Sequence, residues 1–288
     1  MPTVERARAD EGRVTATADY TTAAWCGRSP VPVEYGPAPP MSDIRRLALE
    51  ERGNLAPLLN LHAPADATAA YYALEHPEAR IELFVEYAGN GAARGFLVLA
   101  QTGYDLFRRL AVPFAAHPLG LVKLLQEALK PGQPVLLLLP VEQESWVEGL
   151  LDLSEQRLLD VFRLHTSHFQ PVLNVMVVAA EAPDGGFRFE IRSASGAHAS
   201  AGTNWRGPHY AEVYLEADDE GRARGFSRSV LAAITGQLLS ERRIALYRID
   251  ELDSAAQAEA FEVGFRRSGE RSLLAQAVLR SDVVGAPG

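Results

Sequence analysis

Residues 211–265 read AEVYLEADDEGRARGFSRSVLAAITGQLLSERRIALYRIDELDSAAQAEAFEVGF. The pattern predicts a strand, a charged turn, a loop that opens a long helix, a second strand and a second, short helix. In the loop RARGFS, Gly225 and Ser227 are small enough for a ligand to approach the backbone closely. A helix N-terminus binds phosphate groups because its first amides are unpaired and its dipole is positive there. The segment therefore predicts a phosphate-binding βαβ unit, to which Arg222 and Arg224 can add charge-assisted hydrogen bonds.

The composition limits the classes of protein to consider. The chain has 288 residues, of which 47% are hydrophobic, and this predicts one large or two ordinary domains. A formal net charge of -9, without a long Lys/Arg cluster, argues against a nucleic-acid partner. The longest apolar run, 135–139, is too short for a membrane helix, and residues 1–13 lack the apolar core of a signal peptide. The single cysteine, Cys26, cannot form an intrachain disulfide, so we expect a cytoplasmic protein.

The rest of the chain divides into an arm and two halves. An extended, Pro-rich arm is expected over residues 1–40, a first domain over 41–170 and a second domain over 171–288. In the first domain, we expect helices over 42–53 and 65–74, strands over 81–88, 95–102 and 105–112, a helix over 117–132, a strand over 134–140 and a helix over 143–164. In the second domain, further strands are expected over 173–180, 187–194, 198–205 and 273–280. Both halves share a strand–helix–strand–helix order, which suggests a diverged duplication.

Residues 211–265 resemble the GNAT superfamily of acyl-CoA-dependent N-acyltransferases. The family pattern is a strand, Arg/Gln-x-x-Gly-x-Gly/Ala, a helix, a strand, an Asn-x-x-Ala helix and Gly-Phe. Here Ser227 replaces the last Gly or Ala of the loop, Asp253 replaces the Asn, and Gly264-Phe265 matches the end. The resemblance implies an α/β (α+β) fold of two tandem GNAT-like domains, with mixed central sheets flanked by helices. It also implies acetyl-CoA or another acyl-CoA as co-substrate, without a metal.

The same resemblance implies where the co-substrate binds. The backbone of Val213 and Leu215 would pair with the pantetheine arm, Asp253 would lie near it, and an amide near Leu215 would stabilise the oxyanion. The pyrophosphate loop would consist of Arg222, Ala223, Arg224, Gly225, Phe226 and Ser227.

Amide formation also needs a base for the ammonium proton and benefits from an acid for the leaving thiolate. Glu212 stands where some relatives keep a glutamate base, the alternative being a strand glutamate that faces solvent. The helix position where many members keep a tyrosine acid is Ala260 or Phe261 here, and neither side chain can donate a proton. Tyr214 and Tyr210 are the nearest phenols and the candidate replacements.

Two kinds of function fit this sequence. One is an N-acyltransferase acting on an amine of a small molecule or peptide, for which an acidic chain favours cationic acceptors. The other is a noncatalytic protein that binds acyl-CoA or keeps only the scaffold. The first-half loop over 113–121, PFAAHPLGL, lacks the Arg-x-x-Gly-x-Gly pattern. We therefore predict that this half has lost CoA binding and packs on the second half, closing the acceptor pocket or holding the partner. A homodimer stays open, and no metal is predicted because His165 and His168 lack further ligands at a recognisable spacing.

Overall fold

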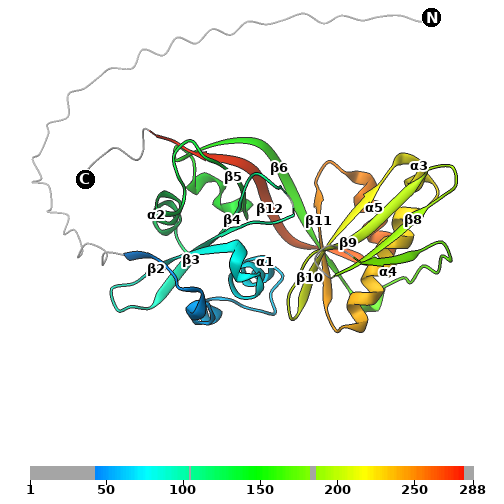
Figure 1. Cartoon of the computed structure of the whole chain (residues 1–288), viewed down its shortest axis with the longest axis horizontal. Helices are drawn as coiled ribbons and strands as arrows, with labels where there is room; N and C mark the ends of the chain where they lie inside the picture. The colour runs from blue at the N-terminus through cyan, green and yellow to red at the C-terminus, as the bar shows by residue number, and fades with distance from the viewer. Residues whose placement is uncertain (1–42, 104, 182–185, 282–288) are drawn as a thin grey trace, which may run out of the picture. The chain divides into compact units, whose positions relative to one another are not determined.

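A computed structural model describes residues 43–103, 105–181 and 186–281, and the arm predicted for residues 1–40 lies outside them. All strands of this described part belong to one twelve-stranded sheet, in the order β1-β2-β3-β4-β5-β12-β6-β11-β10-β9-β8-β7 (Figure 1). The pairs β4–β5 and β10–β11 are parallel, and the other neighbours are antiparallel. Within these residues, no helix has both the length and the apolar character needed to cross a membrane.

The first half supplies six strands and one long helix. Its strands are β1 (Asp43–Arg46), β2 (Ile81–Tyr87), β3 (Ala93–Ala100), β4 (Leu110–Ala115), β5 (Pro134–Pro140) and β6 (Leu151–Leu164). Its helical segments are η1 (Leu49–Leu58), α1 (Ala67–Ala70), η2 (Tyr71–Glu75), η3 (Glu78–Arg80), α2 (Pro118–Ala128), η4 (Val141–Trp146) and η5 (Thr166–His168).

The second half also has six strands, with helices before each of the last two, but it has no counterpart of the helical segments between β1 and β2. Its strands are β7 (Val178–Glu181), β8 (Phe187–Arg192), β9 (His198–Arg206), β10 (Tyr210–Ala217), β11 (Ile244–Asp250) and β12 (Phe265–Leu279). Its helices are α3 (Asp219–Ala223), α4 (Phe226–Ser240) and α5 (Ser254–Val263). The sheet order is symmetric about the β12–β6 pair, because each strand of one half has a counterpart at the same distance from that pair.

The two halves exchange their last strands. The C-terminal strand β12 lies between β5 and β6, which both belong to the first half, and Ala275 is opposite Leu137. In return, β6 lies between β12 and β11, with Phe162 opposite Tyr247. The two long strands run side by side in Figure 1. Each half of the sheet is therefore completed by a strand that comes from the other half of the sequence.

Several predicted elements differ from the structure. The helix predicted over 143–164 is wrong, because a short 3-10 turn is followed there by β6. Apolar residues in this segment fit a period of two as well as a helical one, and pairing with both β11 and β12 favours the strand. The helix predicted over 42–53 is also wrong, since β1 and a 3-10 segment replace it. The strand predicted over 105–112 begins at Leu110, and the one predicted over 173–180 is confined to Val178–Glu181.

The core forms on both faces of the sheet. On the second half, α4 and α5 cover one face, and the apolar side of α4 is buried there through Phe226, Val230, Leu231, Ile234 and Leu238. The opposite face of the second-half strands packs against the helical segment of the first half. The Tyr71 ring stacks on Trp205, with centroids 5.1 Å apart, and the Tyr210 hydroxyl donates a 2.7 Å hydrogen bond to the His62 carbonyl. The first half therefore does pack on the second.

Candidate functional site

A wedge opens between β10 and β11. Their parallel pairing runs from Tyr210 opposite Ile244 to Val213 opposite Tyr247 and does not continue. The rest of β10 stays paired to β9, and a bulge interrupts that ladder between Glu212 and Val213. The edge of β10 beyond Val213 is therefore free of β11, and this is where the resemblance places the pantetheine arm. Val213 lies at the last parallel pair, and Leu215 lies beyond it.

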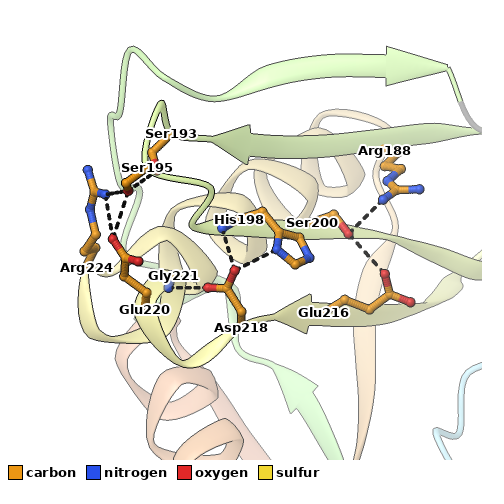
Figure 2. Close-up of polar contacts among 10 residues, drawn as sticks. All are labelled: Arg188, Ser193, Ser195, His198, Ser200, Glu216, Asp218, Glu220, Gly221 and Arg224. Atoms are coloured by element: carbon orange, nitrogen blue, oxygen red, sulfur yellow. Dashed lines mark hydrogen bonds and ion pairs between the residues drawn. The ribbon is translucent and has the colours of Figure 1, made fainter.

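The loop after β10 is held by one carboxylate. Asp218 caps α3 by accepting a 2.6 Å hydrogen bond from the backbone N–H of Gly221. It also accepts from the backbone N–H of His198 at 3.0 Å and lies 2.8 Å from Nδ1 of that residue (Figure 2). The Gly221 hydrogen bond is the main reason why the pKa of Asp218 lies below its ordinary value. Strand β9 therefore fixes the start of the predicted pyrophosphate loop.

Gly221 fits closely against that strand. A Cβ atom at this position would overlap the carbonyl oxygen of His198. We therefore expect Gly221→Ala to shift the loop and to lower the free energy of unfolding by about 1–3 kcal/mol. Chemical denaturation followed by circular dichroism measures this. Gly207→Ala is the matched control, because its Cβ would lie 3.5 Å from its nearest neighbour, the Tyr210 oxygen. Equal stability of the two variants would contradict the prediction.

The N-terminus of helix α4 has the backbone features expected of a phosphate site. Gly225 adopts a left-handed conformation with φ of 72°, which favours glycine, and no side chain caps the helix that starts at Phe226. Ser227 lies in the first turn and is fully buried. The unpaired amides of this turn are the groups expected to bind a pyrophosphate.

A carboxylate that the sequence reasoning missed lies at this helix end. Glu259 of α5 accepts a 2.7 Å hydrogen bond from Arg222 and a short one from the Ser227 hydroxyl. It thus contacts two of the predicted pyrophosphate-binding residues. One feature of the sequence indicates this contact. Glu259 follows Ala256 by three residues on α5, so it lies on the same side of the helix as this buried alanine.

The other loop arginine, Arg224, also has an acidic partner. It donates to Ser195 at 3.0 Å and to Glu220 at 3.2 Å (Figure 2). Its guanidinium lies 4.6 Å from the Phe226 ring centroid. Ala223 ends α3 just before it. The loop therefore carries its positive charge in ion pairs, and an incoming anion must exchange with a carboxylate.

Helix α5 contains both Asp253 and the position where many members of the GNAT superfamily keep a tyrosine. Asp253 caps the helix by accepting a 2.9 Å hydrogen bond from the Ala256 amide. Ala260 is fully buried, and Phe261 is 40% exposed, with its ring set edge-on against Phe162. A phenol that the sequence analysis did not consider is Tyr247 on β11, whose pKa is raised mainly by burial.

Glu212 lies in a buried ion pair. Its carboxylate accepts from Asn204 at 2.9 Å and from the Trp205 indole at 3.0 Å, and it pairs with Arg248. Its side chain is 1% exposed, so the alternative of a solvent-facing glutamate is wrong. Arg248 in turn donates to the Thr68 hydroxyl of the first half. These contacts stabilise the carboxylate and favour a structural role, while the role of base stays a prediction.

The candidate phenols occupy different places. Tyr210 is buried, and its hydroxyl donates to the first half. Tyr214 lies opposite Gly202 in the β9–β10 ladder, and a Cβ on that glycine would lie 2.7 Å from the Tyr214 hydroxyl. Tyr214 follows the last β10–β11 pair, its ring lies against Gly202 of β9, and its acid role remains a prediction.

The equivalent helix end in the first half contains negative charge. His117 caps α2 by accepting from the Gly120 amide at 2.9 Å. Glu86 of β2 is 1% exposed, lies 3.6 Å from the other ring nitrogen of His117, and leaves no room for a Cβ on Gly120. A diphosphate would meet this carboxylate, which supports the prediction that the first half does not bind CoA.

Comparisons with known proteins bear on the fold. No family model and no curated protein matches the chain. The tandem GNAT protein from the clavulanic acid biosynthesis pathway is similar at a TM-score of 0.56 and 13% identity, over 86% of this chain and 100% of that one. A Drosophila protein matches at a TM-score of 0.60 and 14% identity, over 82% and 98% of the two chains. A GCN5-related N-acetyltransferase from Sphaerobacter thermophilus matches at 0.53 and 12%, over 83% and 96%. The chain therefore has the fold of the GNAT acetyltransferases, with two GNAT-like halves in tandem.

Proposed function

We propose that this protein binds acetyl-CoA or another acyl-CoA at the β10–β11 wedge and transfers the acyl group to an amine of a small molecule or peptide. The observation that carries the proposal is the wedge itself, which leads from the bulge at Glu212 and Val213 to the uncapped start of α4. Acyl-CoA, when bound, supplies an activated thioester. The part of β10 beyond Val213, where the pairing with β11 has ended, would pair with its amides, and the first turn of α4 would bind its diphosphate.

The chain's own residues then set the requirements for transfer. The C–N bond forms as the C–S bond breaks. In this step the amine must lose a proton, and the leaving thiolate of CoA must gain one. Because Glu212 is buried against Arg248, we expect water to take the amine proton. Tyr214 is the candidate acid. We expect the acceptor to approach from the side that the first half covers, which fits a small amine.

An acetyl-CoA titration tests this proposal. We expect saturable binding to the full chain in calorimetry, and release of CoA thiol when polyamines, aminoglycosides or lysine peptides are added. Arg222→Ala is expected to weaken binding by about tenfold, the effect of losing one charge-assisted contact. Arg192→Ala is the control, because this side chain on β8 is exposed. If wild-type protein does not bind acetyl-CoA, the proposal is wrong.

A second candidate is a noncatalytic acyl-CoA-binding protein. The burial of Ala260 at the usual tyrosine position and the ion pair of Glu212 favour it. The two candidates differ in one measurement. A transferase releases CoA thiol in proportion to the acceptor, whereas a binder shows the same acetyl-CoA affinity without amine-dependent release.

Glu259 gives a sharper prediction about the same site. Its carboxylate competes with a diphosphate for Arg222 and Ser227, so we expect Glu259→Gln to bind acetyl-CoA about tenfold more tightly, or about 1.4 kcal/mol. Calorimetry at constant salt measures the change. Glu262→Gln is the control, since Glu262 lies on the same helix and pairs with the half-exposed Arg228. Unchanged affinity in Glu259→Gln would show that the carboxylate does not compete.

A further inference from the structure

A cavity of about 180 Å³ lies in the first half, where β4 and β5 diverge. Their parallel pairing ends at Ala111 opposite Leu137, and the strands beyond that pair line the cavity. Helix α1 lines another part of it through Thr68, and the second half contributes Arg248 and Ser272. The cavity thus uses residues from both halves and none of those proposed for acyl-CoA.

The size and walls of this cavity suit a small, mainly apolar molecule. Val112, Pro113 and Phe114 of β4 and Leu138 and Leu139 of β5 supply the larger apolar side chains of the lining. Cavities of comparable volume hold benzene, so a molecule with one six-membered ring and a small polar substituent is of suitable size. Apolar walls around a few polar groups are typical of small-molecule sites.

The polar groups of the cavity favour a neutral ligand. Arg248 has a side chain only 10% exposed, and its charge is balanced by Glu212. Asp66 lies at the exposed rim, where it accepts from the backbone of Asn60. A charged ligand would therefore lose its hydration without gaining an opposite charge, which is costly in a buried site.

One buried acceptor in the lining lacks a partner. Gln143 donates through Nε2 to the Ala115 carbonyl at 3.3 Å, whereas its buried Oε1 atom accepts no hydrogen bond from the described residues. Buried polar atoms are almost always paired, so this oxygen calls for an N–H or O–H donor.

The neighbouring helix end restricts the ligand further. Helix α2 starts two residues after β4, and the buried Glu86 lies at its first turn against Gly120. A phosphate that extended from the cavity toward this turn would meet the carboxylate. This carboxylate argues against a nucleotide or another phosphate ester that would bind across both the cavity and this helix turn.

We propose that this cavity is a second ligand site, specific for a small neutral molecule that has an apolar body and an N–H or O–H donor. A primary carboxamide matches best. Its N–H donates to Gln143 Oε1, while the hydroxyls of Thr68 and Ser272 are available in the lining to donate to its oxygen. The site is separate from the proposed acyl-CoA site and does not depend on acyl transfer.

Three probes of equal size but different charge test this assignment on the full chain. They are benzamide, benzoate and benzylamine, titrated at pH 7 with NMR detection of binding. We expect saturable benzamide binding and at least about tenfold weaker binding of both ions. Gln143→Leu is expected to weaken benzamide binding by about tenfold, whereas Gln133→Leu, which alters an exposed glutamine before β5, leaves it unchanged.

A charge change at the same position gives an independent check if Gln143→Leu is poorly folded. Gln143→Glu is expected to bind benzylamine more tightly than wild type does and benzoate less tightly. The assignment is overturned if wild type binds no benzamide, if either ion binds as tightly, or if Gln143→Leu retains full affinity. Competition between acetyl-CoA and benzamide would also overturn it. Acetyl-CoA binding without benzamide is measured separately, so a failure of the proposed acyltransferase function is recognised on its own.

Discussion

Residues 171–288 expressed alone are expected to remain without a cooperative fold, although they contain the whole predicted CoA-binding unit. In the complete chain both neighbours of β12 come from the first half, and β11 pairs with β6. The fragment would expose the fully buried Leu273 and Leu279, each worth about 1.5–3 kcal/mol when buried. Because a domain is stable by only about 5–15 kcal/mol, these losses and the unpaired ladder exceed what the fragment can offset.

Circular dichroism, size-exclusion chromatography and urea titration measure this result. Residues 149–288 are the informative control, because they add β6 and so restore a partner to both β11 and β12. We expect this longer fragment to regain part of the native signal, and co-expression of residues 1–170 with 171–288 to restore it fully. A monomeric 171–288 fragment with a sharp unfolding transition would show that the strand exchange is not required. The domain boundary at residue 170 stays a prediction until then.

Arg248→Met is expected to lower the free energy of unfolding by about 3–5 kcal/mol, the cost of leaving a buried charge without its partner. The substitution keeps the apolar length of the side chain but removes the positive charge that pairs with the buried Glu212 carboxylate. It also removes the hydrogen bond to Thr68, which joins the two halves. This single pair therefore supports the fold where the halves meet.

The double variant Glu212→Gln, Arg248→Met separates charge from packing. Because it removes both charges, we expect it to be more stable than Arg248→Met alone. Arg192→Met is the exposed control and is expected to change stability by less than about 0.5 kcal/mol. Chemical denaturation provides the values. If Arg248→Met costs no more than the control, the ion pair is not a major source of stability.

The sequence predicts the second half well because its signals are local. The α4 helix, the Gly225 loop before it and the start of α5 near Asp253 depend on neighbouring residues, so a pattern of a few positions is enough. The segment over 143–164 fails for the opposite reason. Its apolar residues allow two periods, and the choice is made by β11 and β12, which are distant in the chain.

In the candidate site, too, the local features follow from the sequence, whereas the contacts between distant elements do not. Loop residues Arg222 to Ser227 lie together, as the pattern predicts, but their pairing with Glu259 depends on how α5 packs against α4. Glu212, the candidate base, is a second example of such a contact. Its partner Arg248 lies on the neighbouring strand β11, and no residue near Glu212 in the sequence indicates this pairing. Side-chain pairing between distant elements is a tertiary property, and a motif does not contain it.

The exchange of β6 and β12 also has a consequence for biosynthesis. Strand β5 emerges from the ribosome long before residues 272–278, which are its partners on one edge. Until they arrive, an apolar strand edge with unpaired backbone groups is open to other chains. Pairing across such a long separation in sequence also makes folding slow. We therefore expect chaperone availability during translation, more than the equilibrium stability of the finished protein, to limit the yield of native molecules in the cell.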